Sequence, residues 1–539
     1  MSASRTAGAS WKSRSTAAVE AALAMFRETT EISRDREAGG AARTSRGRGV
    51  VARPTQNIAI DGQASRAVRF LTVRVLNSWM YPGAGGLPSF ILHQECKRNG
   101  VGEKRDILPE RNTKRFKLIA AVAMIALMLQ SGMLLLALFE PPLPYDIRET
   151  GAEPIESEEF LRALAAITRG DLFRRNRVEV FTNGEAFYPA ILDAVRAARH
   201  SVHIECYIFQ DGKVADGLLE TLIGRARSGV EVRILADAIG SATVPDNHFD
   251  ALLAGGGRAA RYHPMKWYTW PRVNNRTHRE IVVVDGAVGF TGGAGFADHW
   301  LISKPDHPRW RDAMVRLEGD AVTGLQATFA QNWMEATGEM LVQPAYYAYR
   351  PGPGETPALV VDSSPTAGRS TQARVLFQTL LAKAASSIRI TSPYFLPDDS
   401  LIGEIGKAVK ERNVDVKIIV PGKKTDQQMV RASSRGLYGK VIGTGARIYE
   451  YEPSMNHTKS LIVDGIWAVV GTTNMDSRSF GLNDEINVAM LDRTLAARLE
   501  ADFDRDLANS REVSLEEWRR RPPREKVQEW ISWLLARQQ

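Results

Sequence analysis

Two short segments of the sequence each pair a histidine with an Asp-Gly dipeptide that follows an apolar run. The first reads HREIVVVDG at 278–286 and the second reads HTKSLIVDG at 457–465. The two histidines, His278 and His457, are 179 residues apart, and Asp285 and Asp464 are also 179 residues apart. An imidazole can attack as a nucleophile or exchange a proton near neutral pH. A lone histidine before a strand is usually structural, but two in the same register indicate a duplicated site.

Each histidine segment follows a similar series of predicted elements. Helical spacing alternates with strand-like runs at 186–199, 201–209, 216–228 and 230–236, and again at 371–385, 387–392, 400–412 and 414–420. Alternation of this kind indicates α/β layers around a sheet. We therefore predict an α/β fold with two halves, at 155–345 and 346–510. Each half is expected to be a copy of one mixed sheet flanked by helices, and the halves are expected to pack as a pseudo-dimer.

The second segment, together with GTTN at 471–474, resembles the signature of the phospholipase D superfamily, H-x-K-x4-D followed by G-[ST]-x-N. The matching residues are His457, Lys459, Asp464, Thr472 and Asn474. Glu485, in LNDEINV, resembles the acid at the end of that signature. Further segments resemble bacterial cardiolipin synthases in particular: NNRTHREIVVVDG at 274–286, the glycines at 292–293, WRDAMVRLEG at 310–319, 325–333 and 516–535. The resemblance covers roughly residues 155–539.

This resemblance implies two phospholipase D-like halves and phosphatidyl transfer through a phosphohistidine, with no cofactor and no metal. His278 would be the nucleophile and His457 the general acid and base. Each imidazole needs an acid that fixes its tautomer. Asp312 and Glu485 each precede an apolar strand-like run in the same way, so we predict that they are the two orienting acids.

The first segment departs from the signature at two positions. Glu280 stands where lysine is expected, and Gly295 stands where asparagine is expected. Lysine and asparagine would stabilise negative phosphoryl oxygens, whereas an ionised Glu280 would repel them. Three interpretations remain open: Arg276 or Arg279 supplies the missing charge, Glu280 contacts a substrate hydroxyl, or this half has lost its catalytic role. If position 280 once held lysine, Glu280→Lys is expected to preserve or raise transfer.

The N-terminal part of the chain has a different composition from the body. Residues 1–110 are basic and poor in large apolar side chains, so we expect disorder. Residues 118–139 are uncharged, and 22 residues of helix are long enough to cross a bilayer core. Lysine and arginine precede this run, which predicts a single-pass protein with a cytoplasmic N-terminus and the body across the membrane. Together with the resemblance to bacterial cardiolipin synthases, this implies the bacterial inner membrane and a periplasmic body. The tail at 511–539 is expected to be amphipathic.

The charge of the body favours a lipid over a nucleic acid. The first 117 residues carry a net charge of +11 against +8 for the whole chain, so the remainder is slightly acidic. Nucleic-acid binding requires a positive working surface, so we expect no nucleic-acid partner. The expected partners are a phospholipid substrate and the membrane, and the expected reaction is cardiolipin synthesis from phosphatidylglycerol or another phospholipid. Phospholipid hydrolysis, a nucleic-acid phosphodiesterase and an inactive scaffold remain alternatives, and the oligomeric state stays open.

Overall fold

A computed structural model of the chain describes residues 110–138, 146–148, 151, 153–266, 274–348, 352–365 and 370–533. The predicted disorder before residue 110 lies outside these residues. So do the end of the tail, at 534–539, and the segment at 267–273.

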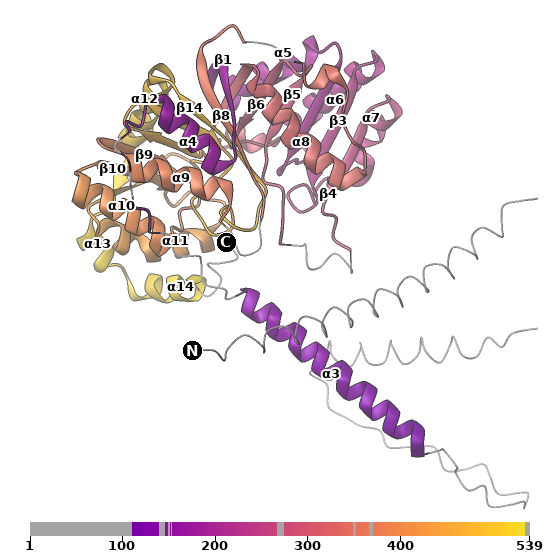
Figure 1. Cartoon of the computed structure of the whole chain (residues 1–539), viewed down its shortest axis with the longest axis horizontal. Coiled ribbons are helices and arrows are strands. Elements are labelled where there is room, and N and C mark those ends of the chain that lie inside the picture. The colour runs from indigo at the N-terminus through magenta and orange to yellow at the C-terminus, as the bar shows by residue number, and fades with distance from the viewer. Residues whose placement is uncertain are drawn as a thin grey trace, which may run out of the picture. The chain divides into compact units, whose positions relative to one another are not determined.

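The described part of the body forms one mixed sheet of 15 strands (Figure 1). The strand order is β15-β11-β10-β9-β12-β13-β14-β8-β1-β7-β6-β5-β2-β3-β4. Strands β1 to β7 and β8 to β14 therefore follow the same order outward from the central antiparallel pair β1–β8. The predicted α/β class with a large mixed sheet is confirmed, and the sheet runs without interruption through both halves.

The strands of the first half are β1 (Asp171–Thr182), β2 (Ser201–Cys206), β3 (Glu231–Asp237), β4 (Arg258–Tyr262), β5 (Ile281–Val284), β6 (Val288–Gly292) and β7 (Ala313–Gly319). Those of the second half are β8 (Thr356–Ser363), β9 (Ser387–Thr391), β10 (Asp415–Pro421), β11 (Arg447–Tyr451), β12 (Ser460–Val463), β13 (Trp467–Gly471), β14 (Glu485–Leu491) and β15 (Ser510–Glu512).

Helices cover both faces of the sheet, as their contacts with β2 illustrate. Val202, Ile204 and Cys206 pack in one apolar cluster with α5 and α6. The alternate residues, His203 and Glu205, bond to side chains of α8 on the other face. This alternation is the two-residue period of a strand that is buried on both sides. The helices between residues 155 and 345 are α4 (Glu158–Thr168), α5 (Gly184–Ala197), α6 (Lys213–Arg227), α7 (Asp250–Ala254) and α8 (Ala321–Thr337), with short 3-10 turns η1 (Asp246–Phe249), η3 (Asp298–Trp300) and η4 (Pro344–Tyr346). Of these, α4 packs in the apolar core of the second half.

The second half has corresponding layers. Buried residues of α9 and α10 pack against one face of its strands, and α12 packs with the cluster on the other face. Capping sets the limits of α10, because the Asp398 side chain accepts a bond from the Leu401 amide and Asn413 ends the helix in a left-handed conformation. The helices are α9 (Gln372–Lys383), α10 (Asp399–Arg412), α11 (Gln428–Ile442), α12 (Arg493–Ala508), α13 (Leu515–Arg519) and α14 (Pro523–Trp533).

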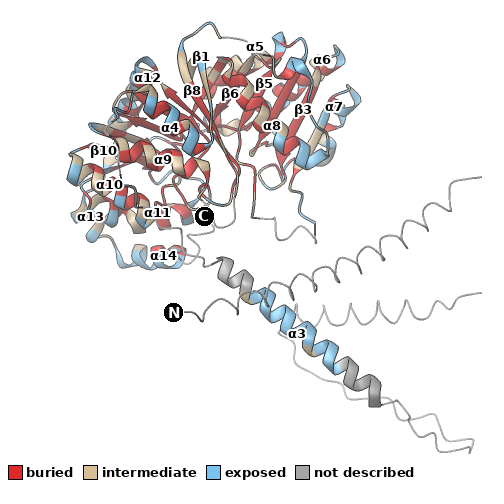
Figure 2. Cartoon of the chain, in the orientation of Figure 1, coloured by how far each residue is buried: buried red, intermediate tan, exposed pale blue. Residues whose placement is uncertain are grey.

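Most of the predicted membrane span at 118–139 falls within helix α3 (Glu110–Leu138). The described side chains of this helix, at 117–132, are almost all exposed (Figure 2). Among the residues that the structure describes, no helix is both long enough and apolar enough to span a membrane. The span stays a prediction.

Candidate active site

His278 is held by residues of the second half. Its backbone amide donates to the Asp484 carbonyl over 2.8 Å, and its Nδ1 lies 3.0 and 3.1 Å from the two carboxylate oxygens of Glu485. Glu485 is fully buried and also accepts a bond from the Thr472 hydroxyl. An acceptor at this position keeps the proton on Nδ1, which leaves Nε2 with a lone pair for attack on an electrophile.

His457 is held in the mirror arrangement by residues of the first half. Its amide donates to the Arg311 carbonyl over 2.7 Å, and its Nδ1 lies 2.9 Å from Asp312 Oδ2. The Trp300 indole donates to the same carboxylate over 3.0 Å. Asp312 and Glu485, which were predicted as orienting acids, therefore each contact a histidine of the opposite half. The sequence did not reveal this exchange, and it means that neither half can form its site alone.

Lys459 lies against the ring of His457. Its Nζ is 2.8 Å from Nδ1 and 3.1 Å from Nε2, and it donates to the His457 carbonyl over 2.8 Å. Burial lowers the pKa of Lys459 to about 8, and the nearby carboxylates of Asp312, Glu485 and Glu280 oppose this shift. Burial and the Lys459 ammonium also lower the pKa of His457, while Asp312 raises it. Lys459 thus places a positive charge beside the carboxylates of both halves.

Aromatic side chains line the histidines unequally. The Tyr207 ring is 5.4 Å from that of His278. Around His457 the rings of Trp310, Trp300 and Tyr394 lie 5.3, 5.6 and 6.3 Å away. The sequence did not single out these neighbours, although Trp310 stands two residues before Asp312. Apolar walls of this kind limit the access of water to the reacting atoms.

Glu280 is buried beside this site and does not contact solvent as a free acid would. Its Oε1 accepts bonds from the backbone amides of Tyr207 and Ile208, at 3.1 and 3.4 Å. These bonds explain why the strand predicted at 201–209 ends at Cys206, because the next two amides turn to Glu280 and leave the ladder. Burial raises the pKa of Glu280 well above its ordinary value, and the two amides only partly offset this. A neutral carboxyl would not repel a phosphodiester as the sequence suggested for the ionised form.

Neither arginine near the first histidine replaces the missing lysine. The Arg276 guanidinium bonds to Asp237 over 2.9 Å and to two backbone carbonyls. The Arg279 guanidinium donates to the Thr328 carbonyl on α8 over 3.0 Å. Both are fully buried in these contacts. The interpretation that Arg276 or Arg279 supplies the missing charge is therefore corrected: both are committed to structural bonds.

Gly295 is glycine because two backbone segments approach closely at this point. A Cβ there would lie 2.4 Å from the Ile208 carbonyl oxygen, which itself accepts a bond from the Phe296 amide over 2.8 Å. In the second half, the groups that match the Ile208 carbonyl and the Phe296 amide are the Tyr394 carbonyl and the Met475 amide. The hydroxyl of Ser392 lies between them, because it donates to the carbonyl and accepts from the amide. The second half therefore has room for the side chain of Asn474, which is buried there. The direct contact in the first half excludes any side chain at 295.

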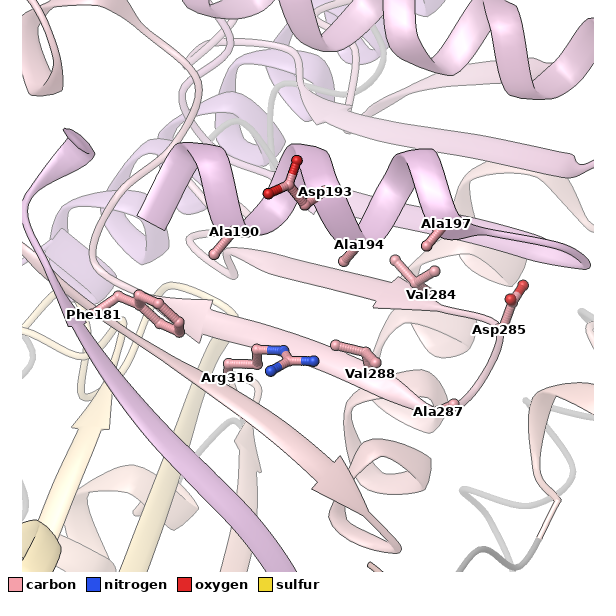
Figure 3. Close-up of a pocket in the computed structure, with 10 residues that line it drawn as sticks. All are labelled: Phe181, Ala190, Asp193, Ala194, Ala197, Val284, Asp285, Ala287, Val288 and Arg316. Carbon is pink, nitrogen blue, oxygen red and sulfur yellow. The ribbon is translucent and has the colours of Figure 1, made fainter. Parts of the chain in front are cut away.

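Asp285 and Asp464 lie at the far ends of β5 and β12 from the histidines. Each has a left-handed backbone, with φ of 54° and 55°, in the turn that leads to the next strand. Their carboxylates accept bonds from the backbone amides at the start of β2 and β9, at 199–201 and 385–387. Asp285 stands at the edge of a surface depression between α5 and strands β5–β7 (Figure 3). The structure thus separates these two predicted site residues from the reacting imidazoles and gives them a supporting position.

One group of possible metal ligands occurs in the described part of the chain. It consists of Asp211, Asp216 and His248, which belong to the region of α6 and η1. Its two carboxylates are exposed, and none of the three residues belongs to the histidine site. This group gives no reason to route the chemistry of the histidines through an ion.

Comparisons with known proteins identify the family of the chain. A family model described as "Cardiolipin synthase, PLD-like domain" matches residues 377–507. The cardiolipin synthase of Geobacillus kaustophilus is 32% identical over 408 residues, which cover 74% of this chain and 79% of that protein. Cardiolipin synthase A of Pseudomonas aeruginosa is 34% identical over 380 residues, covering 70% and 76%. The phosphatidylserine synthase of Haemophilus influenzae shares the fold, with a TM-score of 0.54, 13% identity and coverage of 69% and 99%. The chain belongs to the cardiolipin synthase family of the phospholipase D superfamily.

Proposed function

We propose that this protein synthesises cardiolipin by moving a phosphatidyl group from one phospholipid, such as phosphatidylglycerol, to the hydroxyl of another. The observation that carries the proposal is the pair of histidines, each bonded through Nδ1 to an acid of the opposite half. Because Nδ1 of each histidine is bonded to an acid, both Nε2 atoms remain available to react. A double displacement at phosphorus requires two such atoms, one as nucleophile and one as acid and base.

In the first step, His278 Nε2 forms a bond to phosphorus, and the bond between phosphorus and the leaving alcohol oxygen breaks. That oxygen takes the Nε2 proton of His457. In the second step, neutral His457 accepts the proton of the incoming hydroxyl, whose oxygen forms a bond to phosphorus and displaces His278. The lowered pKa of His457 suits the base role directly. For the acid role it must gain its proton with the substrate, whose negative charge favours the imidazolium.

The lysine and the amide of the second half complete this mechanism. Lys459 stands beside the His457 ring, and its positive charge stabilises the phosphoryl oxygens as negative charge builds on them. Asn474 is buried in the same segment, and its side-chain amide adds a neutral donor. This complete second half-site also argues against an inactive scaffold.

The body is proposed to consist of two phospholipase D-like halves, at 155–345 and 346–510, that stand outside the cytoplasm. Residues 118–139 would form the membrane span, supported by their lack of charge and by the basic residues before them. The tail at 511–539 would lie at the membrane surface. On α14, Val527, Trp530 and Ile531 are spaced as one helical face and are 57%, 63% and 50% exposed.

The function is tested by incubating the purified full-length protein with labelled phosphatidylglycerol and separating the lipids. We expect labelled cardiolipin and release of glycerol. Phosphatidic acid as the main product would show hydrolysis in place of transfer. Quenching without acid, followed by peptide mass spectrometry, should find the phosphoryl group on His278. A phosphoryl group on His457 would exchange the two roles.

The membrane proposal has its own test. The full-length protein should sediment with membranes and be released only by detergent, whereas a chain that lacks residues 112–142 should be largely soluble or loosely bound. A full-length protein that stays in the soluble fraction would contradict the proposed span.

A further inference from the structure

The second carboxyl oxygen of Glu280 is a buried polar atom that the mechanism has not used. Oε1 is fixed by the amides of Tyr207 and Ile208. Oε2 is buried, and among the described residues no group forms a hydrogen bond with it. The side chain as a whole is only 5% exposed. A buried oxygen without a partner costs free energy in the free protein, which is tolerated most readily where a ligand completes the bond.

The position of Glu280 points to the substrate as that ligand. It stands two residues after His278, as Lys459 stands two residues after His457. The first half has no side chain at 295, and a Cβ there would come within 3.0 Å of Glu280 Oε1. Glu280 therefore occupies the space next to the backbone where the second half places its amide donor. It is the polar side chain that this half offers in place of both missing donors.

The charged groups around the site determine which protonation state of Glu280 can bind a phosphodiester. Asp312 and Glu485 are buried carboxylates that bond to the two histidines. Among the described residues of the two signature segments, Lys459 is the cation that contacts a histidine. A third ionised carboxyl here would repel the substrate. A protonated carboxyl would instead present an O–H donor, and the raised pKa of Glu280 supports this form.

We propose that Glu280 binds a non-bridging phosphoryl oxygen of the phosphatidyl group through a protonated Oε2. It would thereby do for the first half, as a neutral donor, what Lys459 does for the second half as a cation. The inference rests on the proposed function, because it takes the phosphatidyl group as the ligand. The groups whose charge or titration couples to Glu280 are Lys459, Asp312, Tyr188 and Cys206.

Binding of inorganic tungstate, a tetrahedral oxyanion, to the full-length protein in detergent provides the test. Glutamine keeps the oxygen that the two amides need and places an N–H donor at the Oε2 position. We therefore expect Glu280→Gln to bind tungstate within about threefold of the wild type at neutral pH, and Glu280→Leu to bind it at least tenfold more weakly. Glu205→Gln is the matched control: this buried carboxyl on β2 bonds to Thr277 and Asn332, and its exchange should leave tungstate affinity unchanged.

The pH dependence separates a donor from a structural anchor. If Oε2 donates, wild-type affinity should fall with rising pH more steeply than that of Glu280→Gln, because only glutamate can lose the donor. The other ionisable groups of the site are the same in both proteins, so their effects cancel in the comparison. One shared pH profile, or full affinity in Glu280→Leu, would overturn the inference. Should the leucine variant not fold, the comparison of wild type with glutamine still decides.

The transfer assay distinguishes this inference from the proposed function. If the wild type forms cardiolipin and the variants at position 280 bind tungstate as the wild type does, the role of Glu280 is excluded and the proposed function is retained. Tungstate binding that depends on Glu280, in a protein that forms no cardiolipin, would leave an oxyanion site and remove the function. An ionised Glu280 that binds the acceptor hydroxyl predicts a third pattern, in which Glu280→Leu raises tungstate affinity, and that result would also overturn the inference.

Discussion

The two half-sites hold the histidine in the same way and differ in the residues at two other signature positions. In both, the histidine amide bonds to a carbonyl of the opposite half and Nδ1 bonds to an acid of that half. The signature positions that accompany His457 hold Lys459 and Asn474, the proposed donors, whereas the matching positions that accompany His278 hold Glu280 and Gly295.

The residues at 280 and 295 are linked through the same backbone contacts. The direct bond between Phe296 and the Ile208 carbonyl brings the backbones close and excludes a side chain at 295, while the amides of Tyr207 and Ile208 take the Glu280 carboxyl. In the second half Ser392 keeps the corresponding segments apart. Cys206 occupies the matching place at the end of β2. Glu280 and Gly295 thus depend on the same packing. Replacing only one of them with its signature residue would not recreate the arrangement of the second half.

The largest expected effect is the loss of either histidine. His457→Ala should lower transfer at least 10³-fold, equivalent to about 4 kcal/mol of barrier, because it removes the proposed general acid and base. His278→Ala should do the same by removing the nucleophile. Radiolabelled lipid transfer measures both. The exposed His200→Ala is the control and should retain wild-type activity. Transfer near the wild-type rate in His457→Ala would exclude this mechanism.

Lysine exchanges test whether the two half-sites are equivalent. Lys459→Met should lower kcat about 10²-fold, because it removes the cation beside the His457 ring. Glu280→Lys should also lower transfer by more than tenfold, because its ammonium would meet two N–H donors in place of a carboxyl. This revises the expectation from the sequence that lysine at 280 preserves or raises activity. Equal or higher activity in Glu280→Lys would revive the idea of a vestigial lysine position.

Exchange of the orienting acids should have a smaller effect that is alike in both halves. Glu485→Gln and Asp312→Asn keep a polar group near Nδ1 but remove the charge that stabilises the imidazolium. We expect each to lower kcat about 10- to 100-fold with little change in KM. Asp285→Asn offers a useful contrast, since it should lower thermal stability more than kcat. An effect confined to one of the two acids would show that the crossed arrangement is not shared.

The close approach at Gly295 should appear in stability. Gly295→Ala places a methyl group 2.4 Å from a backbone carbonyl, which cannot rotate away, so we expect a loss of about 2 kcal/mol in the free energy of unfolding. Gly403→Ala, in helix α10 with no atom within 4 Å of the added Cβ, should be neutral or slightly stabilising. Chemical denaturation of both variants measures the difference. An unchanged free energy of unfolding in Gly295→Ala would mean that the backbone segments at 208 and 295 can move apart to admit a side chain.

The smallest expected effect is the change of stability with pH at Glu280. Its pKa is raised in the folded protein, so the folded state holds its proton where the unfolded chain has lost it. Wild-type stability should therefore decline as the pH rises above the ordinary glutamate range, up to the raised pKa. Glu280→Gln lacks this titration, so the melting temperature of this variant relative to that of the wild type should increase as the pH rises over the same range. A constant difference between the two melting curves would mean that Glu280 is ionised in the fold.

The α/β class, the duplication and most of the candidate site could be predicted from the sequence. Helical and strand periods, two histidine segments in one register and a complete second signature are local patterns, and local patterns can be read directly. The sequence also indicated Asp312 and Glu485 as orienting acids. Asp285 and Asp464 share the register of the histidines but belong to the turns, because a strand carries the two ends of one segment apart.

The contacts between these groups became visible only in the folded structure. His278 and Glu485 are 207 residues apart, and His457 and Asp312 are 145 apart, so no spacing shows that the acids cross between halves. The sequence also does not show the protonation state of Glu280, because burial and two amides of the segment after β2 shift its pKa. It does not show why position 295 is glycine, because the group that excludes a side chain there is the Ile208 carbonyl of that same segment. Residue types and periods specify the elements, whereas distances and burial arise only when distant elements pack together.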